Sequence, residues 1–244
     1  MKVDIVYPMV NRSKFQEDWE LRYSLRTLAE QDWVNRIIVV GYRPTWLKDV
    51  VHISCGDPFP AKDANIIHKI LRVIEQVKDL TDDFVINSDD HYILQPIPLN
   101  GLGPFLEAYQ DRTLKGIRMG VSLWYRRLGE TLEWLGKNQY PQWIMEAHMP
   151  YLVNKGLYLQ AMNRLPWKRK NAVVTHAYFN VTLGETPAQA QKALVWRCKG
   201  PAPEEQISIR MGEATFFNHN DQGLNEEVKR WMEKQFPNPS FWES

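Results

Sequence analysis

Two adjacent carboxylates, Asp89 and Asp90, directly follow a short apolar stretch of the chain, in Asn87-Ser88-Asp89-Asp90-His91. Two such carboxylates repel each other, and burying them is costly unless a cation compensates their charge. Hard oxygen ligands of this kind suit Mg²⁺ or Mn²⁺, which bridge protein carboxylates and substrate phosphates. The pair therefore predicts a divalent-metal site for a diphosphate-containing substrate if it lies at the ligand-facing end of a strand. The alternative is a solvated turn with two ordinary surface acids.

Polar residues on two predicted helices are candidates to hold that diphosphate. Arg22 and Arg26 are four residues apart and so share one helical face. Lys62 and Asn65 stand at the start of a second helix, where backbone N–H groups also favour anions. Arginine matches phosphate oxygens with paired N–H donors. We expect all four to contact the substrate, and the alternative for the arginines is a solvated face with a Glu/Arg pair.

Histidines and further acids are candidates for proton transfer. His148, in Glu-Ala-His-Met-Pro-Tyr, is the candidate base for an acceptor hydroxyl, because the ordinary histidine pKa of about 6.5 suits neutral pH. Glu146, Asp63 and His91 compete for the same role. A lone histidine is otherwise more often a structural group than a catalyst.

A polar turn far along the chain offers further metal ligands. His219 stands in Phe-Asn-His-Asn-Asp, between an apolar stretch and a helix, and Asp221 follows two residues later. We expect His219 or Asp221 to complete the metal shell begun by Asp89 and Asp90.

The elements that must position these residues alternate between strand and helix patterns over the first hundred residues. Apolar runs predict strands at 3–7, 36–40, 50–54 and 83–87. The 3.6-residue period predicts two helices, one carrying Leu21, Leu25 and Leu28 and the other Ile67, Ile70, Leu71, Ile74 and Val77. Such alternation implies a mostly parallel sheet with helices on its faces, and ligands bind beyond the carboxyl ends of its strands. The acidic pair would then lie at the ligand-facing end of the fourth strand.

Beyond residue 100 the pattern is looser and punctuated by glycine and proline. It predicts strand-like structure near 117–124, helix near 150–163, a surface loop at 199–205 and a final helix carrying Leu224, Val228, Trp231 and Met232.

Composition bounds the class of protein. The chain has 244 residues, 44% hydrophobic, and a formal net charge of +1, which argues against nucleic-acid binding by bulk electrostatics. Ten tryptophans provide flat aromatic faces that suit sugar rings and bases. Cys55 and Cys198 have no paired spacing for a metal cage or disulfide framework. With no signal-peptide pattern and no run of about 18 apolar residues, we expect a soluble, cytoplasmic protein.

Four blocks of sequence carry a family resemblance. They are 4–11, then 20–26 with 33–34, 44–47 and 84–90, then 146–151, and finally 217–221 with 236–243. In order and spacing they resemble the Stealth proteins, which include bacterial capsular-polysaccharide phosphotransferases and the catalytic subunit of animal N-acetylglucosamine-1-phosphotransferase. The chain departs from that pattern at Ser88, where the family usually has asparagine, and at 61–65. Its Lys-x-x-Asn, helix and acidic pair are also similar to nucleotide-sugar glycosyltransferases of the GT-A fold.

These resemblances imply one GT-A-like (Rossmann-like) α/β domain over 1–244, with a nucleotide-sugar-binding half at 1–100 and an acceptor-binding half at 101–244. They imply a transferase that uses Mn²⁺ or Mg²⁺ and a nucleotide-sugar donor, expected to be a UDP-sugar, with Asn11 among the donor contacts. Attack at the anomeric carbon transfers the sugar, whereas attack at the β-phosphorus transfers a sugar 1-phosphate. The departures around Lys62 and Ser88 favour glycosyl transfer, and a base is unnecessary if the anomeric configuration is retained.

The acceptor stays open at this point. A polysaccharide, a lipid-linked sugar and a hydroxylated base in phage-type DNA all fit, and the basic cluster at 167–170 would be a landing site for the last. A function of another class is a non-catalytic sugar-nucleotide binding protein. A metal-dependent nuclease or phosphatase would need more clustered acids than this chain has.

Overall fold

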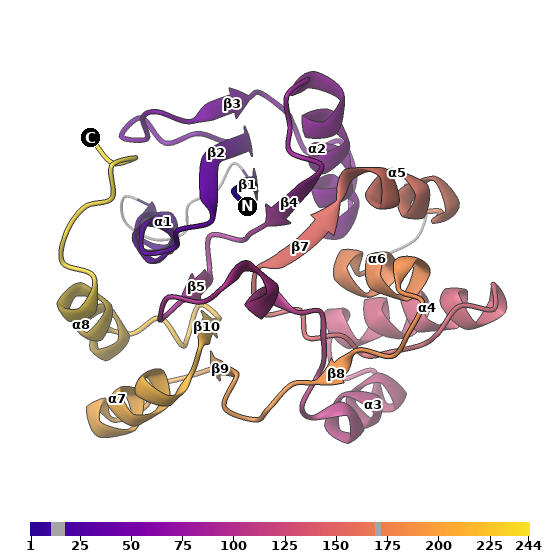
Figure 1. Cartoon of the computed structure of the whole chain (residues 1–244). Helices are drawn as coiled ribbons and strands as arrows, with labels where there is room; N and C mark the ends of the chain where they lie inside the picture. Colours follow the sequence, from indigo (N-terminus) through magenta and orange to yellow (C-terminus); the bar gives the residue numbers. More distant parts are fainter. Residues whose placement is uncertain (11–17, 169–171) are drawn as a thin grey trace.

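A mostly parallel sheet organises the part of the chain that the computed structural model describes, residues 1–10, 18–168 and 172–244 (Figure 1). Its five strands follow the order β3-β2-β1-β4-β7. The parallel strands are β1 (Val3–Met9), β2 (Val34–Gly41), β3 (Val51–Ile53) and β4 (Asp83–Ile86), and β7 (Tyr151–Asn154) pairs antiparallel with β4. These four parallel strands are the ones that the apolar runs predict.

Helices cover both faces of this sheet (Figure 1). On one face, Leu21, Leu25 and Leu28 of α1 (Trp19–Ala29) pack against alternate residues of β1 such as Ile5. On the other face, Val6 belongs to the cluster built by α2 (Lys62–Gln76), α5 (Lys155–Arg164) and α6 (Val174–Thr182). Successive strand residues point to opposite faces, so a strand covered on both sides is apolar throughout.

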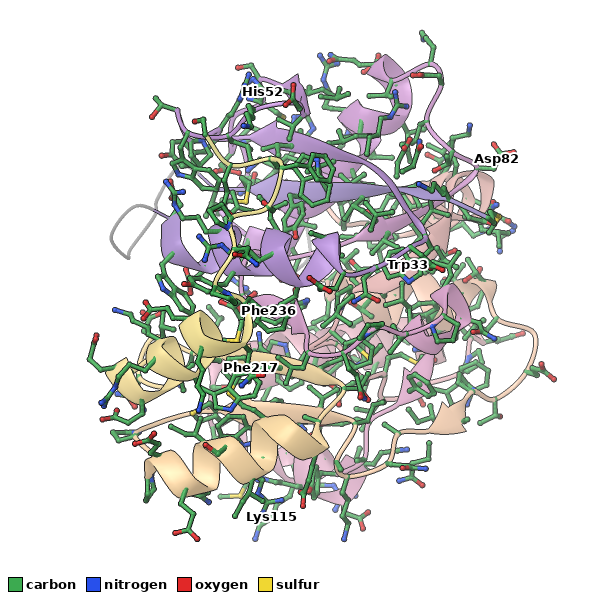
Figure 2. All side chains as sticks on the ribbon, turned by 60° about the vertical axis from the view of Figure 1, so that its left-hand side comes forward. Trp33, His52, Asp82, Lys115, Phe217 and Phe236 are labelled. Atoms are coloured by element: carbon green, nitrogen blue, oxygen red, sulfur yellow. The ribbon has the colours of Figure 1, made fainter. Side chains whose placement is uncertain are left out.

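A smaller sheet lies below the main one in Figure 1. It has the order β5-β10-β9, formed by β5 (His91–Ile93), β10 (Phe216–His219) and β9 (Val195–Cys198). Phe217 of β10 lies between α7 (Glu204–Glu213) and α8 (Glu226–Gln235), as Figure 2 shows. The antiparallel pairing of β5 with β10 sets Asn218 opposite His91, directly beside the acidic pair.

The remaining elements of the described residues are two short strands, two helices and one 3-10 helix. They are η2 (Leu99–Leu102), β6 (Phe105–Leu106), α3 (Gln110–Met119), α4 (Leu123–Lys137) and β8 (Ala188–Gln189), the last pairing with β6. Within the described ranges, none of the helices is long and apolar enough to cross a membrane.

The prediction of strand structure at 117–124 is wrong, because this segment is the junction of α3 and α4. Its apolar residues alternate by chance. Gly120 takes a left-handed conformation (φ 57°) that ends α3, and the Ser122 side chain accepts a hydrogen bond from the backbone N–H of Tyr125 to begin α4. The helix predicted near 150–163 is correct only from residue 155, since its first residues form β7.

Candidate active site

The acidic pair lies in the turn between β4 and β5, at the carboxyl end of the parallel strands. Buried hydrogen bonds fix this turn. The Asn87 side chain donates to the Tyr7 hydroxyl (2.8 Å) and accepts from the Ser88 backbone N–H (3.0 Å), while the Ser24 hydroxyl donates to the His91 carbonyl (2.8 Å). Sequence reasoning missed Tyr7 and Ser24, and a polar residue within an apolar helix face is the signal for the second.

The carboxylates of Asp89 and Asp90 are half-buried side by side. Burial and the neighbouring charge of Asp90 raise the pKa of Asp89 to about 6, and the charge of Lys62 at the start of α2 opposes this. A cation at this place would remove the repulsion and keep both carboxylates ionised. The two carboxylates, when both are ionised, therefore carry more negative charge than Lys62 alone balances.

The residues around this pair fit a divalent ion that takes few protein ligands. His91 contributes a buried Nδ1 without a hydrogen-bond partner among the described residues, and its Nε2 lies 3.9 Å from Asp90 Oδ1. Burial lowers the pKa of His91 to about 4, so its imidazole is neutral at pH 7. In the described ranges no three His, Cys, Asp or Glu side chains converge into a closed metal cage. Mg²⁺ and Mn²⁺ commonly take one or two carboxylates and fill their remaining positions with substrate phosphates and water.

His219 and Asp221, the other expected metal ligands, lie at the end of β10 and in the turn that follows it. His219 is fully buried, with Nε2 2.9 Å from the Tyr92 hydroxyl and Nδ1 3.2 Å from the Asn220 carbonyl. Both ring nitrogens thus have partners inside the protein, and binding a metal would break one of these contacts. Asp221 is exposed in the following turn and does not line the cleft beside Asp90. Asn218, which sequence reasoning missed, donates to the Asp90 carbonyl (3.0 Å).

A cleft of about 200 Å³ brings together residues that are far apart in the sequence. On one side lie Asp90 and His91, with Lys62 and Asp63 at the start of α2. The other side is formed by α4, by β10 and by the loop before β7, through Trp124, Arg127, Asn218 and His148. One carboxylate of the acidic pair, a lysine and two histidines thus line one cleft.

His148 lines the far wall of this cleft, and the Glu146 carboxylate supports it through a hydrogen bond. Glu146 Oε1 accepts from the backbone N–H groups of Ala147 and His148 (3.1 Å each) and lies 3.0 Å from His148 Nδ1. Burial tends to raise the pKa of Glu146, but the hydrogen bond from His148 and the Arg197 charge outweigh it and lower the pKa to about 2. Arg197 Nη1 lies 3.3 Å from the same Nδ1, but the ionised Glu146, which can only accept, is closer. Glu146 therefore favours a proton on Nδ1, which leaves Nε2 of His148 able to take another.

Asp63 is already paired inside the cleft. Its Oδ2 lies 3.4 Å from Arg127 Nη1, and burial raises its pKa against the opposing charges of Arg127 and Lys62. To act as a base, Asp63 would have to accept a proton while it is paired with Arg127.

The structure places Arg22 and Arg26 away from the cleft. Both guanidinium groups pair with Glu243, at 3.2 Å for Arg22 Nη1 and 2.9 Å for Arg26 Nε, and neither lines the cleft. They tie the end of the chain to α1 and hold the buried Trp242 against the core. The Asn65 side chain likewise already has hydrogen-bond partners, because it accepts from the Phe59 backbone N–H (2.9 Å) and donates to the Phe59 carbonyl (2.7 Å).

Two other expectations fall partly or wholly outside the described residues. Asn11 lies outside them, as do Arg169 and Lys170 of the basic cluster at 167–170. Trp167 of that cluster is buried in the core, with its ring 5.3 Å from that of Phe59. It therefore does not present a flat face to a ligand.

The Glu243 contacts predict a stability effect. We expect Glu243→Gln to lower the free energy of unfolding by about 1–3 kcal/mol, because buried donors on Arg26 and Ser240 lose an ionised acceptor. Burial opposes ionisation of Glu243, but hydrogen bonds from Arg26 outweigh it and lower its pKa. This contribution is therefore present at neutral pH and is lost as the pH falls through that lowered pKa.

Urea unfolding at pH 7 measures this effect. Glu226→Gln is the control, since Glu226 pairs with Lys229 on the exposed face of α8 and such pairs contribute little. Equal stability of the Glu243 and Glu226 variants would contradict the anchoring role.

Comparison with known proteins supports the architecture. No family model and no curated protein matches this chain, so neither supports the Stealth resemblance. Among solved structures, the galactosyltransferase LgtC in complex with donor and acceptor sugar analogs is 9% identical, with a TM-score of 0.52 over 97% of each chain. An active-site mutant of LgtC is 11% identical, with a TM-score of 0.50 over 95% of this chain and 94% of the other. At such identities the likeness concerns the fold. The mostly parallel sheet with flanking helices is the GT-A-like α/β fold.

Proposed function

We propose that this chain is a metal-dependent glycosyltransferase that moves a sugar from a nucleotide-sugar donor to an acceptor hydroxyl. The observation that carries the proposal is one cleft at the carboxyl edge of the parallel strands. It combines the Asp90 turn and Lys62 on one side with the Glu146-supported His148 on the other. The solved LgtC structure, which shares this fold, binds donor and acceptor sugar analogs.

The donor side is formed by the acidic turn and the start of α2. Asp89 and Asp90 would hold Mg²⁺ or Mn²⁺, which when bound neutralises charge on the leaving diphosphate. Lys62, whose charge acts on both carboxylates, adds a cation beside the same phosphates. Preorganised positive charge of this kind favours the transition state over the bound substrate. We expect a UDP-sugar as the donor.

The acceptor side is formed by His148 and its supporting groups. In an inverting reaction the acceptor oxygen forms a bond to the anomeric carbon as the bond from that carbon to the diphosphate oxygen breaks. The hydroxyl proton passes to Nε2 of His148, while Glu146 stabilises the imidazolium through Nδ1. In a retaining reaction the bond from the anomeric carbon to the diphosphate oxygen is also replaced by a bond to the acceptor oxygen, but His148 is not needed as a base.

A donor screen tests the proposal. UDP-, GDP-, CMP- and dTDP-sugars are first compared by thermal shift with Mn²⁺, and the nucleotide released from each stabilising donor is then identified. For the nucleoside-diphosphate donors, a diphosphate product supports glycosyl transfer, whereas a monophosphate product indicates sugar 1-phosphate transfer instead; a CMP-sugar is analysed separately. Stabilisation by a donor without any turnover in the presence of Mn²⁺ would indicate a non-catalytic sugar-nucleotide binding protein.

A further inference from the structure

A second, strongly basic groove adjoins the proposed active site. It has a volume of about 320 Å³ and lies between α3, α7 and the strand β9. An intervening hollow of about 280 Å³ shares Trp124, His148 and Asn218 with the active-site cleft. The same hollow shares Arg197 and Lys199 with the groove. A continuous surface path therefore runs from His148 into the groove.

The positive charge of this groove is mostly unbalanced. Of its basic residues, Arg197 pairs with Glu107 (2.9 Å), whose other carboxylate oxygen accepts a hydrogen bond from Thr113. The other four have no ion pair or side-chain hydrogen bond within the described residues; they are Arg112, Lys192, Lys199 and Arg210. Glu213 is the remaining acid in the lining. Four cations thus face one further carboxylate.

The electrostatic environment of Lys199 shows that these charges act on one another. Burial lowers its pKa, and the charges of Arg197 and Arg112 lower it further, outweighing the opposing charges of Glu107 and Glu146. Like charges that are held together without counter-charges destabilise the free protein, and an anionic ligand relieves that repulsion. Arginine and lysine are the residues that recognise phosphate oxygens.

The shape and the aromatic lining favour a small phosphorylated sugar or polyol unit over a long polyanion. Tyr109, Tyr125 and Trp196 line the groove among the cations and offer flat faces to a sugar ring. The volume suits one or two such units, whereas duplex nucleic acid needs an extended surface with many phosphate contacts.

We infer that this groove is the acceptor subsite and that the acceptor carries a phosphate or phosphodiester group next to the sugar or polyol that presents its hydroxyl to His148. The assignment of an acceptor rests on the proposed function. The phosphate site itself rests on the unbalanced cations and stands without it.

Binding of glucose 6-phosphate, which combines a sugar ring with a phosphate, tests the inference. Calorimetric titrations at fixed low salt, with EDTA present, compare glucose 6-phosphate with glucose. The groove variant carries Arg112→Gln, Lys199→Gln and Arg210→Gln. The control variant carries Arg72→Gln, Lys78→Gln and Arg230→Gln, which remove the same net charge from surfaces outside the groove. Circular dichroism and thermal unfolding establish that both variants fold.

We expect glucose 6-phosphate to bind the wild-type and control proteins alike, to bind the groove variant at least about tenfold more weakly, and to bind better than glucose. Equal binding to the groove and control variants, or no preference for the phosphorylated sugar, would overturn the inference. A short duplex DNA that binds the wild-type protein more tightly, and loses binding in the groove variant, would also overturn it in favour of a nucleic-acid acceptor.

Two further measurements are needed. The first distinguishes a lipid-linked from a soluble source of the phosphate, and the second tests the proposed function separately from phosphate binding. Phosphatidylglycerol vesicles that compete with glucose 6-phosphate for the groove would identify a lipid-linked source, and failure to compete would identify a soluble one. Turnover of the nucleotide sugar is measured independently on the wild-type protein. Groove-dependent phosphate binding without any such turnover would refute the proposed function while leaving the phosphate site in place.

Discussion

Asp90→Asn is expected to reduce metal-dependent release of the nucleotide by at least about a hundredfold. The substitution keeps the size of the side chain and the hydrogen bond from Asn218 to the Asp90 backbone, so the turn between β4 and β5 is preserved. What it removes is one of two adjacent negative charges that would hold the cation. Without this charge the cation would bind less tightly, so the negative charge that develops on the diphosphate would lose its principal counter-charge. We therefore expect a larger decrease in kcat than in donor affinity.

The measurement is steady-state nucleotide release with Mn²⁺ titrated from zero, before and after chelation by EDTA. Asp82→Asn is the matched control, because Asp82 stands just before the opposite end of β4, is 85% exposed, and is labelled at the edge of the molecule in Figure 2. The control should retain wild-type turnover. Turnover by Asp90→Asn within about threefold of the wild type, or turnover that EDTA does not affect, would show that the acidic pair is not the metal anchor.

The amino-terminal half of the fold can be predicted from the sequence because local pattern and tertiary environment agree there. Residues of β1 and β2 are buried on both faces, so their segments are apolar throughout, and α1 and α2 each carry an apolar stripe at helical period. Beyond residue 100 the strands are two to four residues long and have no period that distinguishes them from other short apolar runs. The junction at 117–124 shows the consequence, since alternating apolar residues there span the end of one helix and the start of the next.

In the site, too, residues placed by local sequence could be predicted, whereas residues placed by contacts distant in the sequence could not. The position of Asp89 and Asp90 follows from one strand and one turn, and strand ends in a parallel sheet face ligands as a rule. Helical spacing shows that Arg22 and Arg26 share a helical face, but it does not show which residues contact that face. Their partner, Glu243, is more than 200 residues further along the chain. The basic groove has the same character, because α3, β9 and α7 each contribute only one of its cations and Lys192 and Lys199 come from the loops on either side of β9.

His148→Gln is expected to reduce transfer to the acceptor by about 10²–10⁴-fold if the reaction inverts the anomeric configuration. Glutamine fills similar space and can still contact Glu146, but it cannot accept the hydroxyl proton. Donor binding should persist, because Asp89, Asp90 and Lys62 are unchanged. Glu146→Gln should give a smaller loss, since the imidazole remains while the carboxylate that fixes its Nδ1 proton is replaced by a neutral amide.

Single-turnover transfer and metal-dependent donor binding must be measured on the same protein samples to separate these effects. His52→Gln is the control, because His52 is exposed on β3 and contacts the Gly41 carbonyl, away from the cleft. Slow transfer with normal donor binding in His148→Gln, and normal rates in His52→Gln, would assign the proton to His148. Transfer by His148→Gln within about threefold of the wild type would exclude a base at this position. The stereochemistry of the product then decides between the remaining mechanisms. A retaining reaction leaves the Glu146 and His148 pair to orient the acceptor, whereas an inverting one requires another base, for which Asp63 and His91 are candidates in the same cleft.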